Sequence, residues 1–143
     1  MIPVQVSINK NDIIFRNGDD EVVYKTDTNA FLENTGMTIK NIRLPLISEK
    51  VFYLKLNDEA SIFTCGNSLN NILLEVEKEI SNGVLIIDFD GVEEISSYFL
   101  KKYTQFLLET SNKVITINMN TSISYDFGLF ISANIKIKTE EDE

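Results

Sequence analysis

The sequence predicts an α/β protein with a mixed, largely parallel sheet and helices packed on one face, preceded by a β-rich segment. Three apolar runs, 51–56, 84–89 and 114–118, are typical of buried strands. Two stretches between them, 68–81 and 97–110, carry apolar residues at helical spacing. Strands joined by helical crossovers pair in parallel, and right-handed crossovers place successive helices on the same face of the sheet.

The first 48 residues are expected to form the β-rich segment, which can pack on the main domain. Val4 to Ile8 alternate apolar and polar side chains, as a half-buried strand does. Two further strands are expected at 13–16 and 21–25, because Asn17-Gly18 between them is a hairpin signal. Residues 28–36 have room for one helical turn, with Phe31 and Leu32 pointing inward.

The last part of this segment is expected to be extended. The apolar residues that indicate it are Ile39, Ile42, Leu44 and Leu46. Pro45 lies among them and lacks an N–H group, which argues against a central strand.

The main domain is expected at 49–139 and begins with the strand at 51–56. After the first helix, Asn82-Gly83 supplies a stop signal. Following the strand at 114–118, Tyr125 to Ala133 predict a short third helix that Gly128 weakens. Ile135 to Lys138 predict a final edge strand, and residues 140–143 form an acidic tail.

Charge and composition limit the function. The chain carries 22 acidic and 13 basic residues, a net charge of −9, and only Arg16 and Arg43 supply guanidinium groups. Because phosphate contacts dominate affinity for nucleic acids, no direct nucleic acid binding is expected. The sequence shows no membrane-spanning run and no signal peptide, and its single cysteine allows no internal disulfide. These features predict a cytoplasmic protein.

The residue types also limit the chemistry. Without histidine the chain forms neither a Ser-His-Asp nor a Cys-His arrangement, nor a Cys/His zinc site. It also has no glycine-rich phosphate loop. We therefore expect a protein that is not an enzyme and that has no cofactor.

The most informative stretch runs from the strand at 84–89 through an acidic turn into a helix that two serines open. Ser96 or Ser97 fits an N-cap, and either also fits an exposed phospho-acceptor or partner contact. Tyr98 points off the apolar stripe of the helix and suits a binding surface. The carboxylates of the turn would contact a partner or bind a cation such as Mg²⁺, although a solvated acidic loop without metal is the simpler interpretation. They belong to Asp88, Asp90, Glu93 and Glu94.

This stretch resembles the STAS family, the domain of anti-sigma factor antagonists, and more specifically the STAS-like branch of uncharacterised bacterial proteins. The resemblance covers roughly residues 50–135. It rests on Ile87-Asp88-Phe89-Asp90-Gly91-Val92 and on Ile95-Ser96-Ser97-Tyr98-Phe99. In antagonists that are phosphorylated, the helix usually opens with Asp-Ser-Ser/Thr-Gly. Here Ile95 precedes the serines and Tyr98 follows them, so the corresponding position falls on Ser97 or Tyr98.

Two functions from different classes are compatible with these features. The resemblance implies a non-enzymatic regulatory module that docks residues 88–103 on a protein partner, an ATP-binding kinase-like or anti-sigma-like protein. The alternative is an acidic inhibitor of phage origin that mimics a nucleic acid. A regulator should spread its acidic residues around its surface, whereas a mimic should concentrate them on one face.

Overall fold

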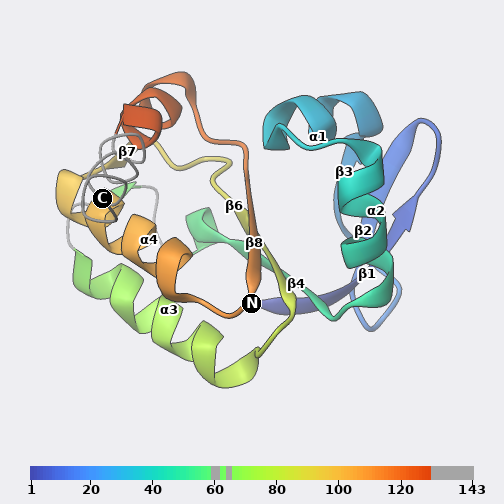
Figure 1. Ribbon diagram of the computed structural model, residues 1–143, viewed down its shortest axis with the longest axis horizontal. Coiled ribbons are helices and arrows are strands. Elements are labelled where there is room, and N and C mark those ends of the chain that lie inside the picture. The colour runs from blue at the N-terminus through green and yellow to red at the C-terminus, as the bar shows by residue number, and fades with distance from the viewer. Residues whose placement is uncertain (59–61, 64–65, 130–143) are drawn as a thin grey trace, which may run out of the picture.

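The computed structural model describes residues 1–58, 62–63 and 66–129 of the 143-residue chain (Figure 1). The expected edge strand at 135–138 and the acidic tail at 140–143 lie outside these residues, as does the end of the expected helix at 125–133. Residues 121–129 are helical. The strands are β1 (Ile2–Ile8), β2 (Asp12–Arg16), β3 (Val22–Asp27), β4 (Val51–Lys55), β5 (Ile62–Phe63), β6 (Val84–Asp88), β7 (Glu94–Ile95) and β8 (Lys113–Ile117). The helices are α1 (Thr28–Thr35), α2 (Ile39–Ser48), α3 (Gly66–Glu79) and α4 (Ser97–Glu109), with a 3₁₀ turn at Leu56–Asp58.

Six strands form one mixed sheet in the order β3-β2-β1-β4-β6-β8. The strands β4, β6 and β8 run parallel to one another. The N-terminal strands β1, β2 and β3 form an antiparallel meander, and β1 joins it to the parallel half by pairing antiparallel with β4. This arrangement confirms the predicted α/β class with a mixed sheet and N-terminal strands.

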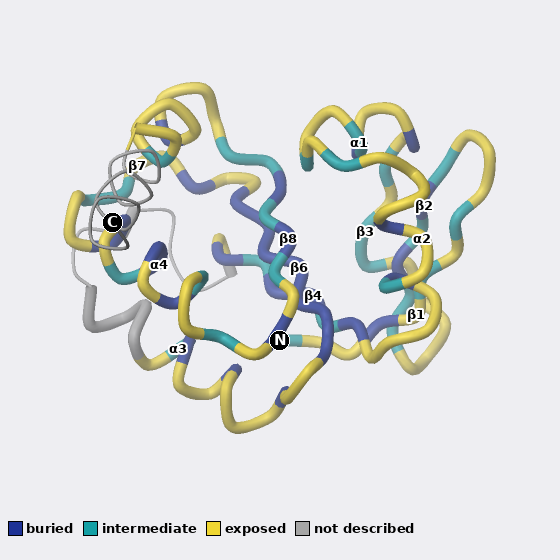
Figure 2. The backbone as a smooth tube through the Cα atoms, viewed as in Figure 1, coloured by how far each residue is buried: buried dark blue, intermediate teal, exposed yellow. Residues whose placement is uncertain are grey.

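The helices α3 and α4 lie on the same face of the parallel strands, as the sequence predicted (Figure 1). Leu85 and Ile87 of β6 point into a core that α3 and α4 complete. The side chains that were expected in this core are all buried: Leu73, Val76, Ile87, Phe89, Leu100 and Phe106. Figure 2 shows the burial of the parallel strands against the exposed outer sides of both helices.

The opposite face of the same strands is covered by the N-terminal segment. Phe31 of α1 and Ile42 of α2 pack in a second core with Val84 and Ile86 of β6. Every residue of β6 is therefore buried, which is why its sequence shows no alternation of apolar and polar side chains. The sequence indicated the strands of this segment but not that its helices form a layer.

The sheet coils strongly between its two halves. Tyr24 of β3 stacks on Tyr53 of β4 with ring centroids 5.7 Å apart. In the sheet order two strands separate β3 from β4. A flat sheet would hold them about 14 Å apart, three times the spacing of neighbouring strands. The coil brings Tyr24 of β3 within hydrogen-bond distance of Asn118, which follows β8.

The prediction of an extended segment around Ile39–Leu46 was wrong, because α2 is a helix that contains Pro45. Ile42 and Leu46, one turn apart, are fully or almost fully buried. Burying two such side chains contributes about 1.5–3 kcal/mol each. Together this offsets the cost of about 3 kcal/mol for an internal proline.

The first helix is also longer than the single turn that was expected. It spans Thr28–Thr35, starts at the N-cap Asp27 and ends at Gly36, whose φ of 66° closes it. Phe31 is fully buried and Leu32 partly buried, so both side chains point inward as expected.

Candidate docking site at the start of α4

The loop that follows β6 is fixed by two apolar side chains and exposes carboxylates between them. Phe89 and Val92 are buried, whereas Asp90 and Glu93 are exposed. Gly91 has a φ of 83°, and a Cβ there would come within 2.7 Å of the Asn57 side chain. The expected acidic loop therefore exists as a tight, well-anchored turn.

Ser96 is the N-cap of α4. Its Oγ accepts a hydrogen bond of 3.1 Å from the backbone N–H of Phe99. Ser97 is the first helical residue and its side chain is exposed. From the sequence alone, either serine could be the N-cap. The structure shows that Ser96 is the cap and that Ser97 is exposed to solvent.

The residues just before the cap are also fixed. Glu94 and Ile95 form β7, which pairs in parallel with Ile62 and Phe63 of β5. This two-stranded sheet was not predicted, because β5 and β7 are only two residues long. It restrains the backbone beside Ser96, while the Glu94 side chain stays exposed.

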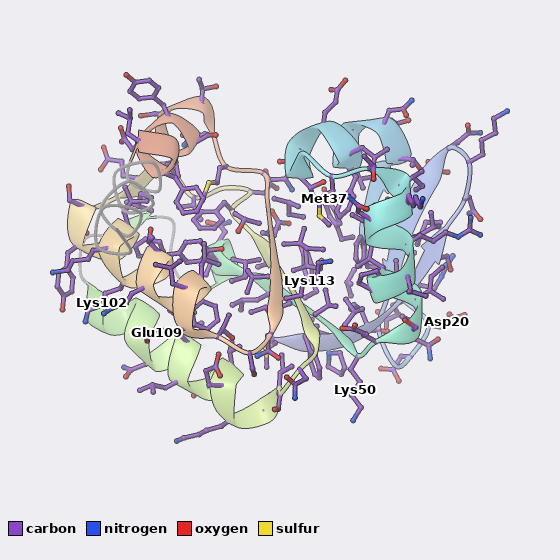
Figure 3. All side chains as sticks on the ribbon, viewed as in Figure 1. Asp20, Met37, Lys50, Lys102, Glu109 and Lys113 are labelled. Atoms are coloured by element: carbon purple, nitrogen blue, oxygen red, sulfur yellow. The ribbon has the colours of Figure 1, made fainter. Side chains whose placement is uncertain are left out.

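Tyr98, the second residue of α4, is 46% exposed. It lies beside Lys102, which lines a groove. The Lys102 ammonium lies 5.6 Å from the centre of the Tyr98 ring, within the range of a cation–π contact. This groove has a volume of about 310 Å³ and lies between α3 and α4. Figure 3 shows Lys102 and Glu109 on the α4 side of the sheet, away from Asp20 and Met37 on the opposite side.

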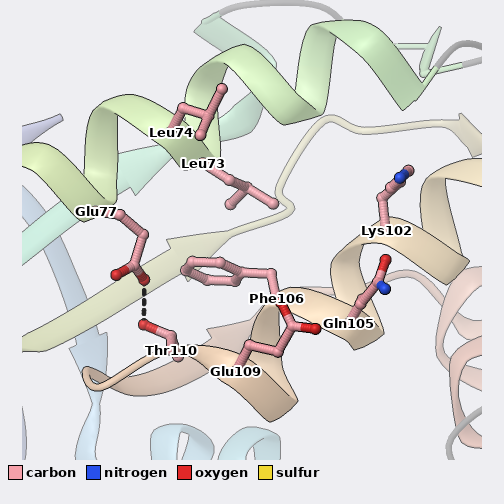
Figure 4. A pocket seen from close by; sticks show the side chains of 8 residues that line it. All are labelled: Leu73, Leu74, Glu77, Lys102, Gln105, Phe106, Glu109 and Thr110. Atoms are coloured by element: carbon pink, nitrogen blue, oxygen red, sulfur yellow. Dashed lines mark hydrogen bonds between the residues drawn. The ribbon is translucent and has the colours of Figure 1, made fainter.

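The groove has an apolar floor and polar ends. Leu73 of α3 and Phe106 of α4 face each other across it (Figure 4). A hydrogen bond from the Thr110 hydroxyl to Glu77 closes the end opposite Lys102. Leu74 lies on the rim and is 60% exposed. Together, Ser97, Tyr98, Lys102 and the groove form what we call the α4 surface.

Asp88 does not belong to this surface. Its side chain is 1% exposed and is hydrogen-bonded to Tyr53, which belongs to the core that includes Phe31 of α1. Asp88 Oδ1 accepts hydrogen bonds from the Asp90 N–H (2.8 Å) and from Asn118 Nδ2 (2.9 Å). The Tyr53 hydroxyl donates to the other carboxylate oxygen. The carboxylates of Asp90, Glu93 and Glu94 are therefore exposed, whereas the Asp88 carboxylate is buried and stabilises the fold.

Asn118 extends this polar network to the N-terminal segment. Its amide nitrogen also donates to the Tyr24 hydroxyl (3.2 Å). The Asn34 amide nitrogen donates to Asn118 Oδ1 (2.8 Å), and the Asn118 N–H donates to Asn34 Oδ1 (3.1 Å). The network joins α1 and β3 to Tyr53 of β4 and to the carboxyl ends of β6 and β8.

The described part of the chain contains no group of three or more Asp, Glu, Cys or His residues positioned to hold a metal ion. Among the tyrosines, burial raises the pKa of the Tyr103 phenol well above its ordinary value, and a hydrogen bond with Thr116 (2.6 Å) opposes this only in part. Tyr103 is fully buried in the core beneath α4, so it has a structural role.

Within the residues that the structure describes, no helix combines the length and apolarity needed to cross a membrane. Comparisons with known protein families, curated proteins and solved structures find no match for this chain.

Proposed function

We propose that the protein is a non-enzymatic regulatory module that binds a protein partner through the α4 surface and the adjacent acidic loop. The resemblance of residues 87–99 to STAS-like domains suggests an ATP-binding kinase-like or anti-sigma-like partner. We place this interaction in the cytoplasm, where the single cysteine can remain reduced.

The observation that carries the proposal is the exposure of Tyr98 beside the groove. An exposed aromatic ring next to an apolar groove with charged ends is typical of a protein interface. Tyr98 loses only two side-chain torsions on binding, so its contacts cost little entropy. The β5–β7 pair and the Ser96 cap hold the backbone around it in one conformation.

Ser97 is the residue through which this surface can be regulated. A phosphate there would sit in the first turn of α4, which contains no acidic residue and favours negative charge. The fold would tolerate it, while the loop with Asp90, Glu93 and Glu94 would become more negative. Repulsion of a partner that contacts the loop would then lower its affinity.

The placement of the acidic residues supports a regulator over a nucleic-acid mimic. Exposed acids occur on the β2–β3 loop at Asp19, Asp20 and Glu21, on the side of the N-terminal segment. Others occur on α3, on the loop after β6 and at the end of α4. A mimic of the nucleic-acid backbone needs a continuous acidic face, whereas these groups lie on opposite sides of the sheet.

The partner can be identified by a photo-crosslinker placed at the proposed contact. We would replace Tyr98 with benzoylphenylalanine in the native host, irradiate the cells and identify crosslinked proteins by mass spectrometry. The matched control carries the same group at Val22, which is 52% exposed on β3. A protein captured from position 98 and not from position 22 is the expected result.

Affinity measurements with that purified partner then test the surface. Tyr98→Ala and Ser97→Asp should each weaken binding by about tenfold or more, since truncated aromatic anchors and unmatched charges carry such costs. Val22→Ala should bind like the parent. If the parent, Tyr98→Ala and Ser97→Asp have equal affinities, the α4 surface is not the docking site.

A further inference from the structure

The helix α2 exposes apolar side chains on the side away from the core. Leu44 is 71% exposed and Ile47 is 55% exposed, although Ile42 and Leu46 of the same helix are buried. Leu44 and Ile47 are three residues apart, so they are neighbours on the helix surface. Single exposed apolar residues are common, whereas contiguous exposed apolar surface is typical of interaction sites.

Two cations share this face. Lys40 lies three residues before Arg43 and four before Leu44, and Arg43 lies four before Ile47. These spacings place the four side chains on one exposed stripe, which we call the α2 face. Within the described residues neither cation forms an ion pair, and α2 itself contains no acidic residue. The α2 face is therefore basic in a chain whose net charge is −9.

A groove of about 700 Å³ runs beside the α2 face. Pro3 and Val6 of β1, Leu46 and Ile47 of α2 and Phe52 of β4 give it apolar lining, and Glu49 and Lys50, one acidic and one basic, also line it. Ile47 therefore belongs both to the groove and to the exposed stripe. Because the surface is concave, it suits inserted side chains better than a flat lipid bilayer.

We propose that the α2 face and its groove bind an acidic amphipathic helix of a partner protein. Apolar side chains of that helix would enter the groove and cover Leu44 and Ile47, and its carboxylates would pair with Lys40 and Arg43. A second copy of the chain is the less favourable occupant of this face, because a symmetric contact would bring two sets of Lys40 and Arg43 into one interface. This surface lies across the sheet from α3 and α4 (Figure 1), so it is separate from the α4 surface.

A synthetic peptide provides the test. The probe is a fluorescein-labelled helix of about 18 residues, long enough for measurable helicity, with leucines on one face and glutamates on the other. Fluorescence anisotropy should show saturable binding to the parent protein. Lys40→Glu/Arg43→Glu and Leu44→Ser/Ile47→Ser should each weaken it by about tenfold or more.

Matched control variants establish whether binding is specific to the α2 face. Lys101→Glu/Leu108→Ser makes the same kinds of change at exposed positions of α4 and should leave peptide binding unchanged. A peptide with lysines in place of glutamates should bind the Lys40→Glu/Arg43→Glu protein better than the parent. Circular dichroism checks that each variant remains folded.

Three results would overturn the proposal: no saturable binding of the acidic peptide, equal binding by parent and α2 variants, or binding that the α4 control also removes. Sedimentation velocity and flotation with phosphatidylglycerol vesicles examine the other occupants. Self-association or vesicle binding that the α2 variants abolish, without peptide binding, would assign the face to a second copy or to lipid instead.

Discussion

Two adjacent serines at the start of α4 differ in what they do for the fold. Ser96 caps the helix through Phe99, whereas Ser97 faces solvent. Ser96→Ala should lower the free energy of unfolding by about 1 kcal/mol, the usual cost of a lost N-cap. Ser97→Ala should change it by less than about 0.5 kcal/mol, as exposed substitutions do. Urea denaturation of both variants measures the difference, and a larger loss at Ser97 would reassign the cap.

Tyr103 is expected to lower the free energy of unfolding at alkaline pH. Burial raises its pKa in the folded state, while the unfolded chain ionises near the ordinary value of about 10. Its contribution is complete below about pH 10 and is lost as the pH rises toward the folded-state pKa, because the unfolded state releases the proton first. The urea midpoint of Tyr103→Phe should therefore decline less steeply above about pH 10 than that of the parent.

The exposed Tyr98→Phe serves as the control and should follow the parent curve. At neutral pH Tyr103→Phe should cost about 1 kcal/mol, because it removes the hydrogen bond with Thr116. Parallel alkaline profiles for the parent and Tyr103→Phe would show that another group controls this transition.

Asn118 combines an unusual backbone with a central place in the partly buried polar network. Its φ is 61°, a region that asparagine and glycine tolerate better than alanine. Asn118→Gly should destabilise the protein by about 1–3 kcal/mol through the loss of hydrogen bonds to Asp88 and Asn34. Asn118→Ala should cost about 1 kcal/mol more, since it adds backbone strain. Equal unfolding energies for the two variants would mean that the backbone there relaxes.

At the scale of the element, α3 offers a matched pair of leucines. Leu73 is buried against α4, whereas its neighbour Leu74 is 60% exposed on the groove rim. Leu73→Ala should cost about 2–5 kcal/mol, as large-to-small changes in a core do. Leu74→Ala should cost less than about 1 kcal/mol, because it leaves no internal cavity. An unfolding midpoint for Leu73→Ala equal to that of the parent would contradict the packing of α3 on the sheet.

Elements whose burial is visible in local sequence were predicted well. The apolar run at 84–88 and the helical spacing in α4 locate buried faces without tertiary information. The helix α2 was missed because the apolar residues around Leu44 and Leu46 were interpreted as an extended segment, in which Pro45 argued only against a central strand. The burial of Ile42 and Leu46 favours the helix, and it depends on packing against strands elsewhere in the chain.

The candidate site was predictable to a similar degree. The exposure of Ser97 and Tyr98 follows from their positions relative to the apolar stripe of α4. The groove could not be predicted, because it forms between α3 and α4 and the local sequence does not determine how these two helices lie relative to each other. The same holds for the inward orientation of Asp88, whose partner Asn118 is itself bound to Asn34, 84 positions earlier in the chain.

For the molecule as a whole, the polar network links the N-terminal segment to the loop before α4. The Asn34 side chain of α1 donates a hydrogen bond to Asn118, and the Asn118 side chain donates one to Asp88. The Asp88 carboxylate also accepts a hydrogen bond from the backbone N–H of Asp90. The loop that carries the exposed carboxylates is thereby attached to both layers of helices. Residues 1–48 consequently help to fix the acidic loop that precedes α4, as well as completing the sheet.

The charge of the whole molecule predicts that it does not bind duplex DNA at physiological salt. Nucleic-acid affinity depends on replacing phosphate counterions with lysine and arginine side chains. Here 22 acidic residues oppose 13 basic ones, and exposed acids lie on both sides of the sheet. The α2 face brings together only Lys40 and Arg43, whereas a protein that binds DNA tightly makes roughly 6–10 phosphate contacts.

A labelled duplex should therefore give no shift with micromolar protein in an electrophoretic mobility assay at physiological salt. At low salt, any weak binding should be reduced in Lys40→Glu/Arg43→Glu, because those residues supply the two cations of the α2 face. Micromolar binding at physiological salt that survives this substitution would reveal a second basic surface and contradict the prediction. Micromolar binding at physiological salt that the substitution removes would instead redefine the α2 face as a phosphate-binding surface, since an acidic peptide and a nucleic acid would then compete for the same two cations.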